Sequence, residues 1–477
     1  MKSKVKIAII KNMQQQNKQD KFDHLRKEFN SFFYEGFDYE FLTDKLQIQF
    51  HFRVDNFVEF HPRVEIPHQS FLHHKHLTKD ALDSLIFHIG MVEVISYWKA
   101  ICPSKLVISD FYLNKEQVSF WKKIYFHGLG EFFYLNGIQT TQEDFMNIEC
   151  VSRREVKAFS VEVDHGSIIP VGGGKDSVVS LELLKKRDGD NLALIMNPRG
   201  ASSATANIAG FESKTIIINR FLDSKLLELN DKGYLNGHTP FSALLGFITI
   251  LSAALAQKKH IALSNESSAN EATVVGTDVN HQYSKSFEFE TDFRNYVEHF
   301  ISTDIKYFSL LRPISELQIA SLFAKSPQYF YDFKSCNAGS KQNIWCGKCS
   351  KCLFTFIILS PFIPPEELKK IYGSNLLEDV ELEVFFDELT GKADVKPFEC
   401  VGTVEEVNVA LCLSVALYEN QTIPYLLKLF IESDLYNQCQ SIDKLDLLKQ
   451  IEKEHYLEPE FLNILLNKMK NFKTEKY

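Results

Sequence analysis

The sequence predicts an α/β protein built around a parallel sheet, with an α+β segment before it and a helical segment after it. Between residues 151 and 360, short β-prone apolar runs alternate with stretches of helical spacing. This order is typical of a parallel sheet wrapped by helices. Before this region, apolar residues recur at every second position, whereas from about Glu405 only helical spacing is found. We therefore expect three parts, 1–150, 151–360 and 361–477.

The first part is expected to be a separate α+β domain. Residues Lys45–Val54 (KLQIQFHFRV) place apolar side chains at alternate positions, which predicts an antiparallel strand with FVEFHPRVEI as its neighbour. From Lys79 to Asn136 the spacing is helical. The N-terminal 21 residues lack the long apolar run and the small-residue cleavage site of a secretory signal.

Composition argues against membrane and nucleic-acid partners. The 477 residues include 53 basic and 62 acidic side chains, a net charge of −9 without a basic block, so a general nucleic-acid surface is not expected. The uncharged stretch Thr239–Gln257 approaches the length of a membrane span. It contains proline, serine and threonine and is followed by the strand-like HIALSN, so we expect a core helix in a cytoplasmic protein.

In the middle part, SIIPV, NLALIMN, KTIIIN and HIALSN are the expected strands. The first runs into GGGKDS, residues 172–177, and then into a helix over Ser177–Arg187. A strand, a glycine turn and a helix can present backbone N–H groups to a phosphate. The P-loop pattern fails because Asp176 follows Lys175, and the dinucleotide pattern fails because Ser177 replaces its third glycine. A plain tight turn is the alternative.

The loop resembles the SGGxDS signature of the PP-loop ATP pyrophosphatases, which cleave ATP to AMP and pyrophosphate while adenylating a substrate oxygen. Gly173, Gly174, Asp176 and Ser177 match it, and Gly172 replaces the leading serine. The resemblance implies that ATP binds to this loop, including Lys175. It also implies that adenine is read where the second strand ends, at Met196 and Asn197. The alternative for these last two is an ordinary strand exit.

Four of the nine cysteines are clustered as C-x9-C-x2-C-x2-C: Cys336, Cys346, Cys349 and Cys352. Four thiolates satisfy tetrahedral zinc and leave no open position, so a structural Zn²⁺ is expected. The pattern is similar to the zinc knot of the deazaguanine-synthesising branch of PP-loop enzymes. We expect it to fix the loop that follows LLRPISELQIASLF beside the nucleotide site. Buried free thiols are the alternative.

Taken together, several stretches resemble the UDP-N-acetyl-α-D-muramoyl-L-alanyl-L-glutamate epimerases over about residues 80–410. Besides the glycine loop and the cysteines, they are SYWKA, FWKKIYFHGLGEFFYLNG, LSNESSANE, NHQYSKSFEFE, LLRPISEL and KPFECVGTVEE. The resemblance implies an ATP- and Mg²⁺-dependent enzyme of peptidoglycan precursor synthesis. It would convert the terminal L-Glu of the UDP-muramoyl dipeptide into D-Glu.

Adenylation would make this chemistry feasible. Removing an α-proton beside a free carboxylate places two negative charges together, whereas a mixed anhydride with AMP withdraws electrons. Candidate catalytic residues are Asp176, which would hold Mg²⁺, and His281, Lys285, Glu399 and Cys400 for proton transfer. Cys400 is attractive because thiolates act as Cα bases in some racemases. For each residue, ordinary packing is the alternative.

Asn265 and Glu266, at the end of an expected strand, could hold Mg²⁺ or substrate, or could cap the next turn. Two other functions remain open. One is a PP-loop ligase or amidating enzyme acting on a nucleobase or tRNA, although the acidic composition disfavours tRNA. The other is a non-catalytic nucleotide-binding regulator, which the intact Asp176 and the full cysteine set disfavour.

Overall fold

The computed structural model describes residues 17–274, 276–418, 421–441 and 448–470. Most of the N-terminal stretch considered for a signal lies outside these residues. The described strands form one mixed sheet of 11 strands, in the order β11-β10-β7-β8-β9-β4-β2-β1-β5-β6, with β3 paired to β2. They are β1 (Ser31–Phe41), β2 (Lys45–Val54), β3 (Val58–Phe60), β4 (Arg63–Pro67), β5 (Lys105–Ile108), β6 (Asn147–Cys150), β7 (Asp164–Pro170), β8 (Leu192–Met196), β9 (Thr215–Phe221), β10 (Lys258–Leu263) and β11 (Lys306–Ser309).

The predicted antiparallel strand is confirmed as β2, whose alternate side chains are buried along its whole length. It pairs antiparallel with β1, β3 and β4, and the last two form from the predicted neighbour FVEFHPRVEI. The helical prediction for Lys79–Asn136 is wrong at one point, because β5 lies inside it. A strand of four residues is too short for its period to stand out between two long helical patterns.

The middle part contains the predicted parallel strands. β7, β8, β9, β10 and β11 pair parallel with one another. β9 also pairs antiparallel with β4, through Val64 and Arg220, so the sheet continues from the first part into the middle part. The division at residue 150 therefore does not interrupt the sheet, and the three-part organisation stays a prediction.

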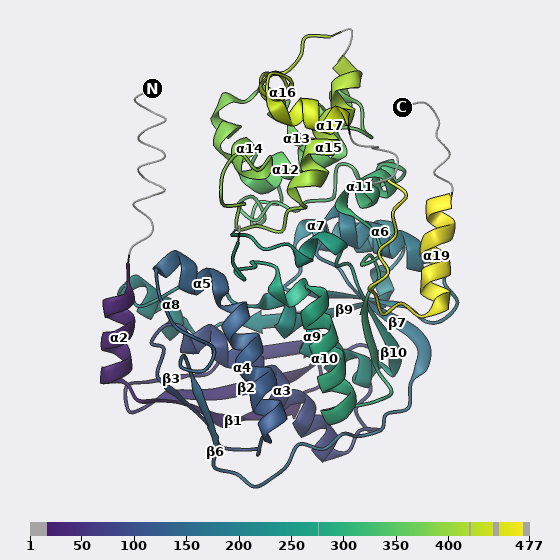
Figure 1. Cartoon of the computed structure of the whole chain (residues 1–477). Coiled ribbons are helices and arrows are strands. Elements are labelled where there is room, and N and C mark those ends of the chain that lie inside the picture. The colour runs from purple at the N-terminus through teal and green to yellow at the C-terminus, as the bar shows by residue number, and fades with distance from the viewer. Residues whose placement is uncertain (1–16, 275, 419–420, 442–447, 471–477) are drawn as a thin grey trace.

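Helices cover the sheet and form a group of their own at one end of the molecule (Figure 1). The α-helices are α2 (Gln19–Glu28), α3 (Lys79–Trp98), α4 (Lys115–Gly128), α5 (Gly130–Asn136), α6 (Lys175–Leu184), α7 (Gly200–Ile208), α8 (Ser224–Asp231), α9 (Phe241–Ala256), α10 (Phe287–Phe300), α11 (Glu316–Ala324), α12 (Ser350–Leu359), α13 (Pro365–Tyr372), α14 (Glu383–Leu389), α15 (Val404–Val415), α16 (Tyr425–Ile431), α17 (Asp434–Gln440) and α19 (Pro459–Lys470). Short 3₁₀ turns that matter for the site are η2 (Ser267–Asn270) and η3 (Tyr283–Lys285).

Two apolar helices lie in the core. The uncharged stretch forms α9, which is buried along most of its length, so the core-helix prediction is confirmed. Among the described residues, α3 is the helix long and apolar enough to cross a membrane, and its most apolar window is completely buried inside the protein. A buried ion pair, Arg220 Nη2 to Glu93 Oε1 at 2.8 Å, joins α3 to β9.

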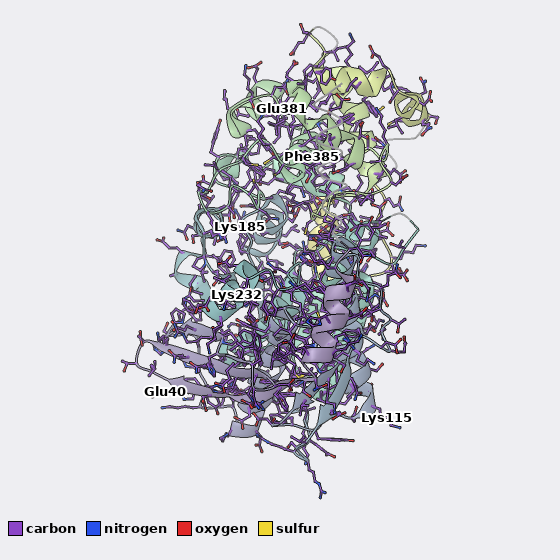
Figure 2. The ribbon with its side chains drawn as sticks, turned by 90° about the vertical axis from the view of Figure 1, so that its left-hand side faces the viewer. Glu40, Lys115, Lys185, Lys232, Glu381 and Phe385 are labelled. Atoms are coloured by element: carbon purple, nitrogen blue, oxygen red, sulfur yellow. The ribbon has the colours of Figure 1, made fainter. Side chains whose placement is uncertain are left out.

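The core divides into two apolar clusters. One joins the antiparallel strands to α3, α4, α9 and α10; the other joins α6 and α11 to the helices from α12 to α17. Figure 2 shows the resulting elongated shape, with Glu40 and Lys115 near one end and Glu381 and Phe385 near the other. The last helix, α19, returns to the α/β sheet, where Phe461 contacts Phe308 with a ring-centroid distance of 4.6 Å.

Candidate active site

The glycine loop links the end of β7 to the start of α6 in a fixed conformation. Gly173 has φ +89°, and a Cβ there would lie 2.6 Å from the Ser202 backbone nitrogen, so the position requires glycine. Gly174 is the N-cap of α6. The Ser177 hydroxyl accepts from Gly173 N at 3.2 Å and donates to Gly174 O at 3.0 Å. Gly172 is exposed with open space around it, so packing does not require glycine there.

Three carboxylates gather at the start of α6. Buried Lys175 is ion-paired with both Asp176 and Glu316, the first residue of α11. Glu266, which follows β10 and is 4% exposed, completes the group, and the three carboxylates offer oxygens within 4.8 Å of one another. We call Asp176, Glu266 and Glu316 the carboxylate cluster. Glu316 lies in the quoted stretch LLRPISEL but is not among the site residues predicted from the sequence.

The carboxylate cluster carries more negative charge than Lys175 balances. Burial, together with Asp176 and Glu266, raises the pKa of Glu316 to about 8 despite the attraction of Lys175. Burial alone would also raise the pKa of Asp176, but Lys175 and Lys351 hold it below its usual range. Hard oxygen ligands in a converging set suit Mg²⁺, so these residues fit a magnesium ion.

A second group of ionisable side chains surrounds Cys400, which is partly exposed. Lys285 Nζ, in η3, donates to Cys400 Sγ at 3.1 Å. His281 also interacts with the Cys400 thiol, and its Nδ1 lies 2.5 Å from Glu131 Oε2 on α5. Burial alone would raise the pKa of the Cys400 thiol, but Lys285, His281 and Lys351 lower it to about 6. Cys400 is therefore mainly thiolate at neutral pH.

The loop that carries Cys400 is fastened to the segment that carries His281 and Lys285. Val395 forms an antiparallel bridge with Val274, and Lys396 N donates to Thr273 O at 3.0 Å. Gln282 Nε2 donates to Val401 O at 3.2 Å. Residues more than one hundred positions apart thereby meet at one thiol. Of the predicted proton-transfer residues, the structure brings Cys400, His281 and Lys285 into direct contact.

Lys285 connects the two groups. Burial alone would lower the pKa of Lys285, but Cys400, Glu266 and Asp176 together raise it. Its ammonium therefore interacts with the thiolate on one side and with the carboxylate cluster on the other. Arg312, 1% exposed, fixes this arrangement: it donates to Glu266 O at 2.6 Å and to the Lys285 carbonyl. Arg312 also lies in LLRPISEL and is likewise not among the predicted site residues.

The remaining predicted residues lie around these groups. Glu399 accepts from Asn337 Nδ2 at 2.7 Å, and burial raises its pKa. Met196 ends β8, the strand beside β7, and Asn197 follows it, so both lie at the sheet edge that carries the glycine loop. Asn197 has φ +49°, and its Oδ1 accepts from Arg220 N at 2.7 Å. Whether they contact a nucleotide stays a prediction.

The four clustered cysteines converge. Their Sγ atoms lie within 4.8 Å of one another, and the closest pairs are 3.5, 3.7 and 3.8 Å apart. Tetrahedral zinc with bonds of about 2.3 Å requires sulfur–sulfur distances of about 3.8 Å, so the residues fit this metal. The preceding segment contacts the glycine loop, because Lys334 N donates to Gly173 O at 2.8 Å. The cysteine cluster therefore lies beside that loop, as expected.

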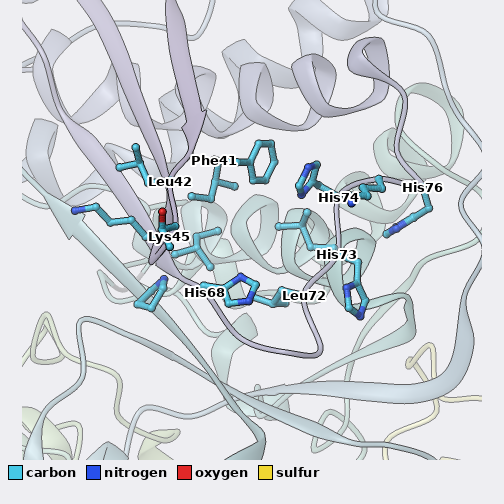
Figure 3. Close-up of a pocket in the computed structure, with 14 residues that line it drawn as sticks. Phe41, Leu42, Lys45, His68, Leu72, His73, His74 and His76 are labelled. Atoms are coloured by element: carbon cyan, nitrogen blue, oxygen red, sulfur yellow. The ribbon is translucent and has the colours of Figure 1, made fainter.

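A cavity of about 590 Å³ lies elsewhere, at the tip of the β1–β2 hairpin (Figure 3). Phe41, Leu72 and Leu255 form apolar parts of its wall, and His73 and His74 are among its polar residues. Leu255 precedes β10, whereas Glu266 follows it. The cavity and the carboxylate cluster are thus at opposite ends of that strand.

A mixed α/β sheet with a glycine loop, a carboxylate cluster and a buried acid–base group defines an α/β protein equipped for proton-transfer chemistry. Two family models match the chain: the MurL N-terminal domain over residues 23–310 and the MurL C-terminal domain over residues 332–440. The chain belongs to the MurL family.

Relatives support the assignment. A UDP-N-acetyl-alpha-D-muramoyl-L-alanyl-L-glutamate epimerase of Xanthomonas oryzae pv. oryzae is 35% identical over 380 residues, 78% of this chain and 83% of that protein. Proteins of the same name from a Micromonospora species and from Salinispora tropica are each 36% identical. These matches cover 68% of this chain and 73% and 72% of the two relatives.

Proposed function

We propose that this protein is the ATP-dependent epimerase that inverts the terminal L-Glu of UDP-N-acetylmuramoyl-L-Ala-L-Glu in a PP-loop-type site, and that it works in the cytoplasm. The observation that carries the proposal is Lys285, whose Nζ donates to Cys400 Sγ at 3.1 Å and whose charge is also stabilised by Glu266 and Asp176 of the carboxylate cluster. Carboxylate activation and proton transfer require such neighbouring sites, because the carboxyl group that is activated is bonded directly to the Cα that loses its proton.

In the first half of the reaction, ATP binds at the glycine loop. The N–H groups of Gly172–Gly174 and the N-terminus of α6 would face its phosphates, with Lys175 and Ser177 alongside and Met196 and Asn197 near the adenine. Asp176, with Glu266 and Glu316, would hold Mg²⁺, which would offset the phosphate charge. The substrate α-carboxylate attacks the α-phosphate, pyrophosphate leaves, and an acyl-adenylate forms.

In the second half, the Cys400 thiolate takes the α-proton and becomes a thiol, while the electron pair delocalises into the acyl-adenylate. A second acid returns a proton to the opposite face of Cα, and His281, Lys285 and Glu399 are the candidates. Water then releases AMP and the D-Glu product. The positive charges around Cys400 keep it deprotonated at neutral pH, which a Cα base requires.

The test is incubation with UDP-N-acetylmuramoyl-L-Ala-L-Glu, ATP and Mg²⁺ in D₂O. We expect AMP, pyrophosphate and deuterium at the Glu Cα, measured by NMR and mass spectrometry. AMP without deuterium would contradict epimerisation and favour an adenylating ligase. If neither product forms, the non-catalytic regulator becomes the better explanation.

We also propose that the four clustered cysteines hold one structural Zn²⁺. Because thiolate ligation contributes directly to folding, Cys349→Ser should lose the zinc and melt at a lower temperature. Elemental analysis and thermal denaturation measure both quantities. Cys439→Ser, a buried cysteine outside the cluster, is the matched control and should keep its zinc. Zinc-free wild-type protein with unchanged stability in Cys349→Ser would contradict the proposal.

A further inference from the structure

Glu131 is a hydrogen-bond partner of the His281 imidazole. It reaches the site from α5, and its Oε2 is 2.5 Å from His281 Nδ1. His281 interacts electrostatically with the Cys400 thiol, and Lys285 donates to the same sulfur at 3.1 Å. Glu131, His281, Cys400 and Lys285 thus form one continuous chain of alternating charge. Tyr134, also on α5, contacts Phe398 with a ring-centroid distance of 5.6 Å, which fixes the helix against the Cys400 loop.

The charges around this chain favour a charged His281. Burial alone would lower its pKa, but the hydrogen bonds to Cys400 and Glu131 raise it to about 9. His238 lies 3.7 Å from the same Glu131 oxygen, yet burial and the neighbouring His281 lower its pKa to about 4, so it is neutral. Lys99 also faces Glu131, and Lys351 and Glu399 face Cys400. The Glu131 carboxylate therefore stabilises the charged form of His281, whereas His238 beside it is neutral.

A metal ion is the competing explanation, because Glu131, His238 and His281 each offer a ligand atom within 4.8 Å of the others. Zinc bonds of about 2.0–2.2 Å in tetrahedral geometry hold two ligand atoms about 3.3–3.5 Å apart. The 2.5 Å contact between Glu131 Oε2 and His281 Nδ1 is too short for two ligands of one zinc ion, and it is shorter even than the about 2.7–2.9 Å of a charged N–H···O hydrogen bond. The distances favour proton sharing.

We infer that Glu131 is a positioning residue for the epimerisation: it fixes His281 as an imidazolium and thereby keeps Cys400 in the thiolate form. The inference rests on the proposed role of Cys400 as the Cα base. Glu131 would keep that base in its reactive, deprotonated form. Its place is that of the carboxylate in a nucleophile–base–carboxylate chain, where the third residue orients the second. Glu131 would not touch the substrate.

The experiment measures the alkylation rate of Cys400 by iodoacetamide as a function of pH, without substrate, with the modified peptide quantified by mass spectrometry. Only the thiolate reacts, so the wild-type rate should rise with a midpoint near pH 6. In Glu131→Gln, which keeps the side-chain size, we expect the midpoint to move up by at least one pH unit. The loss of a neighbouring opposite charge shifts a pKa by about 1–3 units, so alkylation at pH 6.5 should slow by about threefold or more.

Glu143→Gln, the same change at an exposed position, is the matched control and should leave the midpoint unchanged. If Glu131→Gln fails to fold, His281→Asn should produce the same upward shift. The double variant should match His281→Asn alone, because Glu131 acts through His281. An unchanged midpoint in a folded Glu131→Gln protein would overturn the inference, as would a bound metal ion that Glu131→Gln loses.

The alkylation result does not depend on the substrate, so it separates this inference from the proposed function. If the midpoint shifts but the protein has no epimerase activity, the Glu131–His281–Cys400 interaction is supported and the proposed reaction is wrong. In an active enzyme, Glu131→Gln should also move the acidic limb of the Cα exchange rate upward in pH while AMP formation continues. A merely structural role would lower both rates at every pH.

Discussion

Cys400→Ala is expected to lower the yield of epimerised product by about a hundredfold or more, the usual scale for losing a positioned acid or base. AMP and pyrophosphate should still form, because the proposed adenylation would depend on the glycine loop and the carboxylate cluster. The activated intermediate would then hydrolyse without inversion. Product stereochemistry, by chiral analysis of the released Glu, and AMP yield should be measured in the same reactions.

Cys150→Ala, which removes a partly buried thiol in β6, is the matched control and should epimerise normally. Retention of Cα exchange from one face in Cys400→Ala would show that the partner acid–base group still works. If Cys400→Ala epimerises normally, Cys400 is only a packing residue. His281 and Glu399 would then be the next candidates for the acid and base at Cα. Loss of AMP formation as well would mean that this loop shapes substrate binding.

Asp176→Asn is expected to abolish substrate-dependent pyrophosphate release. Its carboxylate is one of three that converge beside the glycine loop, and an amide binds Mg²⁺ far less well than a carboxylate. The fold should survive, because Lys175 keeps its ion pair with Glu316. Pyrophosphate release and thermal denaturation measure the two effects.

Asp188→Asn, at an exposed position shortly after α6, is the matched control and should release pyrophosphate at the wild-type rate. A folded Asp176→Asn protein with full pyrophosphate release would rule out the metal role of Asp176. The glycine turn would then have only a structural role.

Parts of the candidate site could be predicted because their signals are local. The glycine loop is six consecutive residues, and the conformation of Gly173 follows from its lack of a Cβ. The four cysteines lie within 17 residues, and three of them follow at intervals of three. Cys400, His281 and Lys285 were named from resemblance, and the structure places them in contact. Glu316, Arg312 and Glu131 were not chosen, because no local pattern distinguishes them from other charged residues.

By itself, the sequence determined the period of each long element, the glycine turn and the spacing of the cysteines, since these depend on neighbours along the chain. Only the tertiary structure decided which elements meet. It joined β4 to β9 in one sheet and brought Glu316 to Lys175, 141 residues away, and Glu131 to His281, 150 residues away. Periodicity reports which face of an element is buried, but not which element covers it. The partners of a buried charge are set by packing across the sheet, so the acid–base chain exists only in the folded protein.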